Sequence, residues 1–383
     1  MIAEIEAPVD VELGRPRGRL RFAWHGPSAG IGPKTGLIFH IHGYGARFDD
    51  PYAGKLRPWL ADQFDCVAVS VDYHGAGIKG DAAVLVAPDF FDQLDRSHGI
   101  RIPIPPGVPA DVLTATLCEQ ILPFLASHGL TRLADDCVLR KTGDDYVSFG
   151  VLPALDHLAV AAHLIGTHGL DRTRLFAIGD SYGGYVASLI SKIAPNTLRM
   201  VVDNSGFTGP GDNPAVLFGE SRTVVAGVSV RTLAPYAFSQ DTAAPDCFCA
   251  SHLAIRDLDR PEHWESASDT ATFAYHSIED TLAPVARKQA LAAMLAPVRR
   301  YDLRIVGEAD VDGRLFKDVG HGMRASLRGL FSLSYDRWMA TSPPRVDATD
   351  FDLGTTLALA CADKVYTFRY RCDGVSLEIA AGS

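Results

Sequence analysis

The sequence lacks any uninterrupted apolar stretch approaching the ~18 residues that a membrane-spanning helix needs. Its first eight positions carry acids where a secretory signal peptide would have basic residues followed by an apolar run. Basic residues are also in the minority, because 36 Lys and Arg face 46 Asp and Glu and leave a net charge of −10. That balance argues against nucleic acid or an anionic membrane as a partner. We therefore expect a cytoplasmic protein that binds neither.

Patterns typical of metal sites and disulfide frameworks are missing as well. The seven cysteines are an odd, scattered set without C-x-x-C spacing, and Cys247 and Cys249 are too close together to clamp a zinc ion by themselves. There is no H-x-x-x-H pair and no clustered-carboxylate signature. We expect free thiols, as in a reducing compartment, and no metal or cofactor.

What the chain does contain is an alternation of short apolar runs and amphipathic helices. With 383 residues, 47% of them hydrophobic, it can bury a large core. Runs 36–42 and 67–73 are rich in β-branched residues and stop at glycines, as strands of a buried parallel sheet do. Further strands are expected at 9–13, 19–24, 175–178, 200–203, 272–276 and 303–306, and helices at 110–128, 150–169, 182–193 and 285–295.

This order predicts an α/β protein with a mostly parallel central sheet and helices on both faces. Residues 1–342 would form one catalytic domain, interrupted by insertions at about 78–146 and 205–270, which are rich in Pro or Gly. Residues 343–383 would form a small C-terminal β appendage, with three strand-like runs between 357 and 380.

The main chemical signal is Gly179-Asp180-Ser181-Tyr182-Gly183, followed by Gly184, between a strand and a helix. A nucleophilic serine at such a position sits on a strained, sharp turn, so the residues two before and two after it must be very small. The helix that begins there directs its N-terminal amides at developing negative charge. A glycine turn that only packs a helix on a strand would give the same letters, but the strand-to-helix placement favours Ser181 as nucleophile.

A serine hydroxyl needs a base, and the base needs an orienting carboxylate. Asp280 follows the strand predicted at 272–276, and His321 stands between two glycines after the strand predicted at 303–306. The order along the chain, serine, then acid, then histidine, is one in which such triads occur on a parallel sheet flanked by helices. His276 is the alternative base and Asp203 the alternative acid, while Glu279 is expected to point elsewhere.

When a serine attacks a carbonyl group, the tetrahedral intermediate carries a negatively charged oxygen, the oxyanion. This oxyanion needs preorganised hydrogen-bond donors. The backbone amide of Tyr182, directly after the nucleophile, is expected to be one donor. The second is expected in the turn His42-Gly43-Tyr44-Gly45 after the strand at 36–42, with Tyr44 contributing its amide.

Between about Gly36 and Met323 the chain resembles the α/β-hydrolase superfamily. The elements that carry the resemblance are His42-Gly43-Tyr44, the turn around Ser181, His276-Ser277-Ile278-Glu279-Asp280 and Gly320-His321-Gly322. The tyrosine after His-Gly is similar to that of some acetyl-ester deacetylases, and Tyr182-Gly183-Gly184 is similar to the turn of prolyl-oligopeptidase-type peptidases. The chain also resembles a bacterial group of uncharacterised hydrolase-like proteins, some of them associated with loci for surface-sugar or flagellin glycosylation. That resemblance rests on Asp49-Asp50-Pro51-Tyr52, Ile255-Arg256-Asp257-Leu258 and Asp312-Gly313-Arg314-Leu315-Phe316-Lys317.

The first functional hypothesis is a serine esterase that cleaves a small-molecule ester, such as an acetyl ester, through an acyl-serine intermediate. A peptidase or amidase with the same triad is the second, and Glu220, Arg222 or Arg256 would then bind a peptide terminus. An acyltransferase that uses an alcohol in place of water is the third. A non-catalytic binding protein is disfavoured because all three triad residues are present.

Overall fold

A computed structural model describes residues 1–75, 84–86, 89–141, 146–212, 220–233, 238–239, 241–244, 246–264, 268, 270–341 and 348–382. Its central sheet has eight strands in the order β1-β2-β4-β3-β7-β8-β11-β12. The first two pairings, β1 with β2 and β2 with β4, are antiparallel, and the others are parallel. The strands are β1 (Ile2–Glu6), β2 (Arg19–His25), β3 (Gly36–Ile41), β4 (Cys66–Val71), β7 (Leu175–Asp180), β8 (Met200–Asn204), β11 (Ala271–Ser277) and β12 (Tyr301–Val306).

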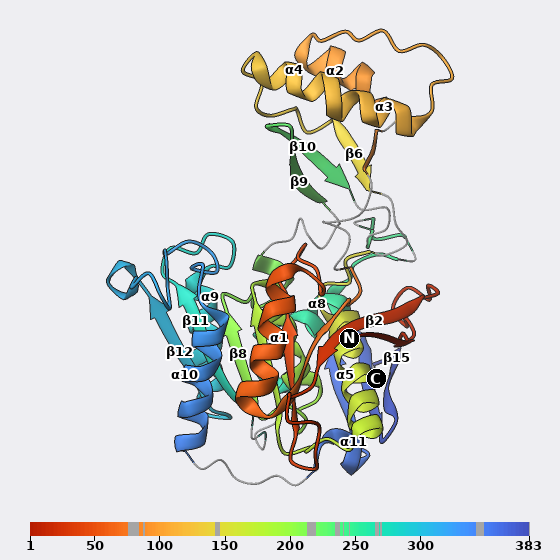
Figure 1. The fold of residues 1–383 in the computed structure, drawn as a ribbon. Helices are drawn as coiled ribbons and strands as arrows, with labels where there is room; N and C mark the ends of the chain where they lie inside the picture. The colour runs from red at the N-terminus through yellow and green to blue at the C-terminus, as the bar shows by residue number, and fades with distance from the viewer. Residues whose placement is uncertain are drawn as a thin grey trace.

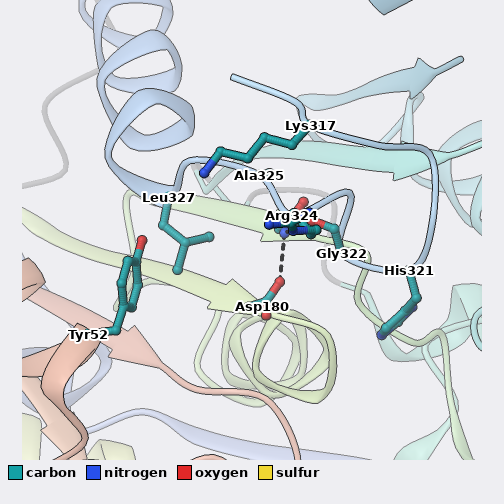
Figure 2. Close-up of a pocket in the computed structure, with 9 residues that line it drawn as sticks. Tyr52, Asp180, Lys317, His321, Gly322, Arg324, Ala325 and Leu327 are labelled. Atoms are coloured by element: carbon teal, nitrogen blue, oxygen red, sulfur yellow. Dashed lines mark hydrogen bonds between the residues drawn. The ribbon is translucent and has the colours of Figure 1, made fainter. Parts of the chain in front are cut away.

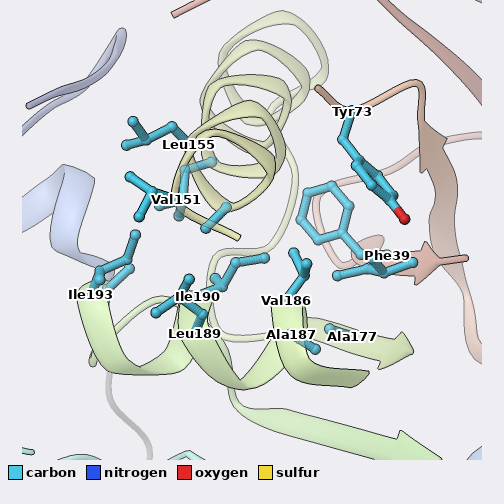
Figure 3. Close-up of a cluster of buried hydrophobic side chains, with 14 of the residues drawn as sticks. Phe39, Tyr73, Val151, Leu155, Ala177, Val186, Ala187, Leu189, Ile190 and Ile193 are labelled. Carbon is cyan, nitrogen blue, oxygen red and sulfur yellow. The ribbon is translucent and has the colours of Figure 1, made fainter. Parts of the chain in front are cut away.

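Helices cover both faces of this sheet (Figure 1). Along β3, Phe39 belongs to the core cluster shared with α5 (Val151–His168) and α6 (Tyr182–Ile193), while Ile38 belongs to the cluster shared with α1 (Pro51–Phe64) and α10 (Leu327–Ala340). This alternation follows from the two-residue period of a strand. Figure 3 shows the first of these layers, where α5 and α6 pack together. Helix α9 (Val285–Leu295) packs on the same side through Leu291 and Leu295. The predicted α/β-hydrolase fold is confirmed.

The prediction of a strand at 9–13 is wrong. The strand that pairs with β2 is β1, and residues 11–13 form a turn. The side chain of Asp10 is buried and accepts the backbone amides of Glu12 and Leu13, at 3.1 Å each. An aspartate that bonds amides two and three residues ahead stabilises a turn and prevents the extended backbone that the alternating pattern suggested.

The two predicted insertions meet in one cap. Its sheet has the order β5-β6-β10-β9 and joins β5 (Val84–Val86) and β6 (Val138–Lys141) to β10 (Val228–Leu233) and β9 (Glu220–Val225). The chain predicted as helical at 110–128 is α3 (Ala110–Thr116) and α4 (Leu122–Ser127), joined by a π-helical turn at Leu117–Ile121. Together with α2 (Phe90–His98), these helices stand at the top of Figure 1. The predicted boundaries at 78 and 343 lie outside the described residues.

The three strands predicted near the C-terminus are confirmed as β13 (Thr356–Cys361), β14 (Lys364–Arg371) and β15 (Gly374–Ala381), preceded by α11 (Asp350–Leu353). They form an antiparallel sheet of their own. Its buried side chains, Tyr366 and Phe368 among them, belong to the same core cluster as α5 and α6. The remaining elements are α8 (Ala250–Arg256) and 3-10 turns at Pro210–Asp212, Pro261–His263 and Glu308–Asp310.

All seven cysteines are free thiols. Within the described part of the chain, no helix combines the length and the apolar character that crossing a bilayer requires.

A buried lysine of α6 gives the fold a pH-dependent stability. Lys192 Nζ donates to the carbonyl oxygens of Ile255 and Asp257, at 2.9 and 2.8 Å, at the end of α8. Burial lowers the pKa of Lys192 from 10.5 to about 7. Between these two values the unfolded chain binds more protons than the folded one, so the free energy of unfolding rises with pH.

Lys192→Met is expected to flatten this dependence. Each pH unit inside the window contributes up to ~1.4 kcal/mol, so the difference between pH 7.5 and pH 9 is measurable by urea unfolding. Lys55→Met, on the exposed side of α1, is the control and should keep the slope of the unsubstituted protein. Equal slopes in all three proteins would contradict the assignment to Lys192.

Candidate active site

Ser181 lies on the tight turn between β7 and α6, with φ 55° and ψ −122°. The surrounding backbone leaves no room for a side chain two residues before or two residues after Ser181. A Cβ atom at Gly179 would lie 2.2 Å from the carbonyl carbon and oxygen of Gly183, and one at Gly183 would lie 2.0 Å from the carbonyl oxygen of Ile41. The strained φ of Ser181 is therefore held by close packing on both sides of the turn, as the spacing of the motif predicted.

The three side chains that the sequence singled out form one continuous hydrogen-bonded chain. His321 Nε2 lies 2.7 Å from Ser181 Oγ, and His321 Nδ1 lies 2.8 Å from Asp280 Oδ2 and 3.0 Å from Oδ1. Because a carboxylate only accepts, Nδ1 carries the proton and donates to Asp280, which leaves Nε2 free to accept from the serine hydroxyl. The arrangement can remove a proton from Ser181.

The loop after β11 fixes the carboxylate of Asp280. Its Oδ1 accepts the backbone amides of Leu282 and Ala283 at 3.0 and 2.9 Å. Burial favours a raised pKa for Asp280, but the hydrogen bonds from His321 and from the Ala283 amide outweigh it and place the pKa below the ordinary value. Asp280 is therefore ionised and oriented before any substrate binds. The neighbouring Glu279 is exposed, as expected.

Both alternative residues are engaged elsewhere. His276 Nε2 lies 2.7 Å from the carbonyl oxygen of Ala283, to which it donates, and it is 3.6 Å from Asp280 Oδ2. His276 thus supports the loop that carries Asp280 instead of reaching Ser181. Asp203 is buried in an ion pair with Lys288, at 2.7 Å, and accepts the Gly206 amide. The geometry places His321 and Asp280 beside Ser181 and neither alternative.

Three residues that the sequence reasoning missed hold the histidine loop, residues 307–326 between β12 and α10, in place. Asn204 Nδ2 donates to the carbonyl oxygen of Gly322 at 3.1 Å, and the Gly322 amide donates to Ser205 Oγ at 3.1 Å. The ring of Phe207 stacks on the His321 imidazole, with centroids 6.0 Å apart and an interplanar angle of 24°. The only sequence signal for Asn204, Ser205 and Phe207 is their position at the end of, or just after, the strand that follows the nucleophile's helix.

The predicted oxyanion turn lies against the nucleophile turn. A Cβ atom at Gly43 would lie 3.3 Å from Ser181 Cβ, and the ring of Tyr44 packs edge-on against that of Tyr182, with centroids 6.0 Å apart. Tyr182 is the first residue of α6, and in the described part of the chain its amide donates to no backbone carbonyl. His42 stacks on Tyr73, whose hydroxyl donates to the His42 carbonyl at 2.7 Å, so the start of this turn is fixed.

A pocket of about 380 Å³ borders the histidine loop (Figure 2). It lies where the carboxyl end of β7 meets the start of α10 and the first turn of α1. Its lining is mixed, with acidic, basic, amide and apolar side chains. The lining residues are Tyr52, Asp180, Asn204, Lys317, His321, Gly322, Arg324, Ala325 and Leu327.

Two of the residues considered for binding a peptide terminus are committed to other contacts. The guanidinium of Arg256 is fully buried and pairs with Glu12. Arg222 belongs to the cap and pairs with Asp135. The side chain of Glu220 lies outside the described residues. Arg256 therefore cannot bind a peptide terminus, because its buried guanidinium already pairs with Glu12. For Arg222 the possibility stays a prediction.

The strand order, the turn at Ser181 and the succession Ser, Asp, His define a protein of the α/β-hydrolase fold. The chain belongs to the family described as "Protein of unknown function (DUF2920)", whose family model matches residues 117–379. No curated protein matches the sequence.

The solved structures with a similar fold include hydrolases of several kinds. The chain is 13% identical to an acylaminoacyl peptidase from Pyrococcus horikoshii, with a TM-score of 0.48, and the match covers 89% of this chain but 41% of that one. An acetyl xylan esterase from Paenibacillus sp. R4 is 12% identical, with 84% and 79% coverage and a TM-score of 0.45. Esterase 2 of Thermogutta terrifontis is 13% identical, with 88% and 92% coverage and a TM-score of 0.40. Likenesses this distant identify no substrate.

Proposed function

We propose that this protein is a serine hydrolase that cleaves carboxylic esters through an acyl-serine intermediate. The observation that carries the proposal is the unbroken chain of hydrogen bonds from Asp280 through His321 to Ser181. Such a chain is what a hydroxyl needs in order to act as a nucleophile near neutral pH. Its members come from three separate loops at the carboxyl ends of β7, β11 and β12.

In the proposed reaction, Ser181 Oγ attacks the ester carbonyl while His321 Nε2 takes its proton. The imidazolium formed is stabilised by Asp280. The backbone amides of Tyr182 and Tyr44 donate hydrogen bonds to the oxyanion. His321 then donates its proton to the leaving alcohol, and the acyl group stays on Ser181. Water then attacks the acyl-serine while His321 takes its proton, and His321 returns this proton to Ser181 Oγ as the carboxylic acid is released.

The residues considered as anchors for a peptide terminus give no support to a peptidase. Arg256 is buried in its pair with Glu12, and Arg222 is paired with Asp135 in the cap. A small ester needs no such anchor, only an acyl pocket beside the nucleophile. Acyl groups as short as acetyl are the first ones to test.

The test combines turnover with covalent labelling. The protein is expected to hydrolyse p-nitrophenyl acetate and butyrate and to gain one phosphonyl group from a fluorophosphonate probe, as seen by intact mass. Ser181→Ala should lose both properties, whereas Ser127→Ala, an exposed serine of the cap, should keep both. A folded protein that the probe does not label, or a Ser181→Ala variant with an unchanged rate, would overturn the proposal.

A further inference from the structure

The pocket beside the histidine loop borders the proposed base and the residue that precedes the nucleophile. In the proposed reaction His321 Nε2 hands its proton to the departing oxygen, so the leaving alcohol must lie beside the imidazole. His321 lines this pocket, and so does Asp180, which directly precedes Ser181. This position makes the pocket the candidate space for the alcohol part of the substrate.

Basic side chains mark this pocket in a chain whose net charge is −10. Lys317 and Arg324, both from the histidine loop, line it. Figure 2 shows the side chain of Lys317 extending over the pocket towards the side formed by Leu327. Within the described residues, Lys317 forms no ion pair, whereas Arg324 Nε lies 4.0 Å from Asp318 Oδ2. In the part of the chain that the structure describes, Lys317 thus brings to the pocket a positive charge without an ion-pair partner.

One acidic side chain, Asp180, also lines the pocket, and Asn204 holds its carboxyl group. Asn204 Nδ2 donates to Asp180 Oδ1 at 2.6 Å, while Asn204 Oδ1 is buried without a partner in the described part of the chain. Burial raises the pKa of Asp180, so its carboxyl keeps a proton more readily than an exposed one and repels an anion less.

We propose that this pocket binds the leaving alcohol of an acidic ester, with Lys317 and Arg324 holding a carboxylate carried by that alcohol. The inference rests on the proposed esterase function and names its substrate class. A singly charged carboxylate suits the site better than a doubly charged phosphate, because Asp318 already offsets part of the charge of Arg324. Lys317 and Arg324 would act on specificity and not on the bond-breaking step itself.

The experiment compares two chromogenic acetates whose leaving phenols have nearly the same shape. One is 3-carboxy-4-nitrophenyl acetate, which is anionic, and the other is the neutral 3-carbamoyl-4-nitrophenyl acetate. We expect kcat/KM to be higher for the anionic ester, by roughly five- to tenfold, as for a hydrogen bond to a charged group in a partly exposed site. Added salt should reduce this ratio.

Substitutions at the two cations assign the preference to the pocket. Lys317→Gln should lower the ratio to near one, Lys317→Glu should bring it below one, and Arg324→Gln should lower it less. Arg314→Gln is the control, because it removes the same charge from an exposed position of the same loop that does not line the pocket. Its ratio should match that of the unsubstituted protein.

The possible failures are distinct. If both esters are cleaved without preference, or if Arg314→Gln lowers the ratio as much as Lys317→Gln, the inference about the pocket is wrong and the esterase function stands. If neither ester is cleaved and the fluorophosphonate probe does not label Ser181, the proposed function fails and the leaving-group pocket fails with it.

Discussion

Replacing Asp280 by asparagine is expected to lower kcat for p-nitrophenyl acetate by about 10⁴-fold, with little change in KM. The reason is the pattern of donors around the carboxylate. Asp280 Oδ1 accepts two backbone amides, from Leu282 and Ala283, so the amide oxygen of an asparagine must take that place. The NH₂ group then occupies the position of Oδ2, which faces His321 Nδ1 at 2.8 Å.

A donor at that position reverses the tautomer of the imidazole. His321 Nδ1 becomes the acceptor, the proton moves to Nε2, and Nε2 can no longer take the proton of Ser181. The overall shape of the site is kept, so probe labelling should be slowed along with turnover while the folded structure stays intact. Rates are measured by the release of p-nitrophenol, and folding by circular dichroism.

Glu279→Gln is the matched control. It makes the same chemical change at the adjacent residue, whose side chain is exposed. Its kcat should stay within a factor of about two of the unsubstituted value, as expected for a surface substitution. A loss in Asp280→Asn no larger than that in Glu279→Gln would show that Asp280 does not orient the base.

The parts of the site that could be predicted are those whose requirements are local. The strained turn at Ser181 demands glycines at fixed offsets, Gly179 and Gly183, and the structure shows that neither position has room for a Cβ atom. Likewise, Asp280 lies shortly after the end of β11 and His321 lies on the connection between β12 and α10, and parallel strands bring their carboxyl ends to one edge of the sheet. The chain order and the strand pattern were enough to bring these side chains together.

The parts that could not be predicted depend on distant segments. Asn204 and Ser205 support the histidine loop from 118 and 117 residues away, and neither follows a pattern that indicates such a contact. The cap sheet pairs β6 with β10 across the whole nucleophile region, so the sequence showed two insertions where the structure has one unit. At 9–13 the alternating letters predicted a strand, but a buried aspartate accepting local amides favours a turn.

The pairing of Glu12 with Arg256 could not be predicted from the sequence for a different reason. We expect this pair to have a large effect on the free energy of unfolding. A glutamate and an arginine are normally exposed, yet these side chains are 1% and 0% exposed. Arg256 Nη1 and Nη2 lie 2.8 and 2.5 Å from the two oxygens of Glu12, and Arg256 Nε donates to the Ser148 carbonyl. Tyr366 of β14 donates its hydroxyl to Glu12 Oε1 at 3.0 Å. One buried ion pair thus ties the N-terminal turn, α8 and the C-terminal sheet together.

Glu12→Gln is expected to lower the free energy of unfolding by ~3–5 kcal/mol, because it leaves the guanidinium of Arg256 buried without a counter-charge. Burial favours a raised pKa for Glu12, but the charge of Arg256 outweighs it and keeps the pKa below its ordinary value, so the full loss applies at neutral pH. Glu4→Gln is the control, because Glu4 faces Arg19 at 3.6 Å with both side chains more than half exposed, and it should cost less than ~1 kcal/mol. Urea unfolding at pH 7 measures both.

A double variant, Glu12→Gln with Arg256→Met, should be more stable than Glu12→Gln alone, since it removes the unpaired charge. Equal losses in Glu12→Gln and Glu4→Gln would mean that the pair does not hold these three segments together.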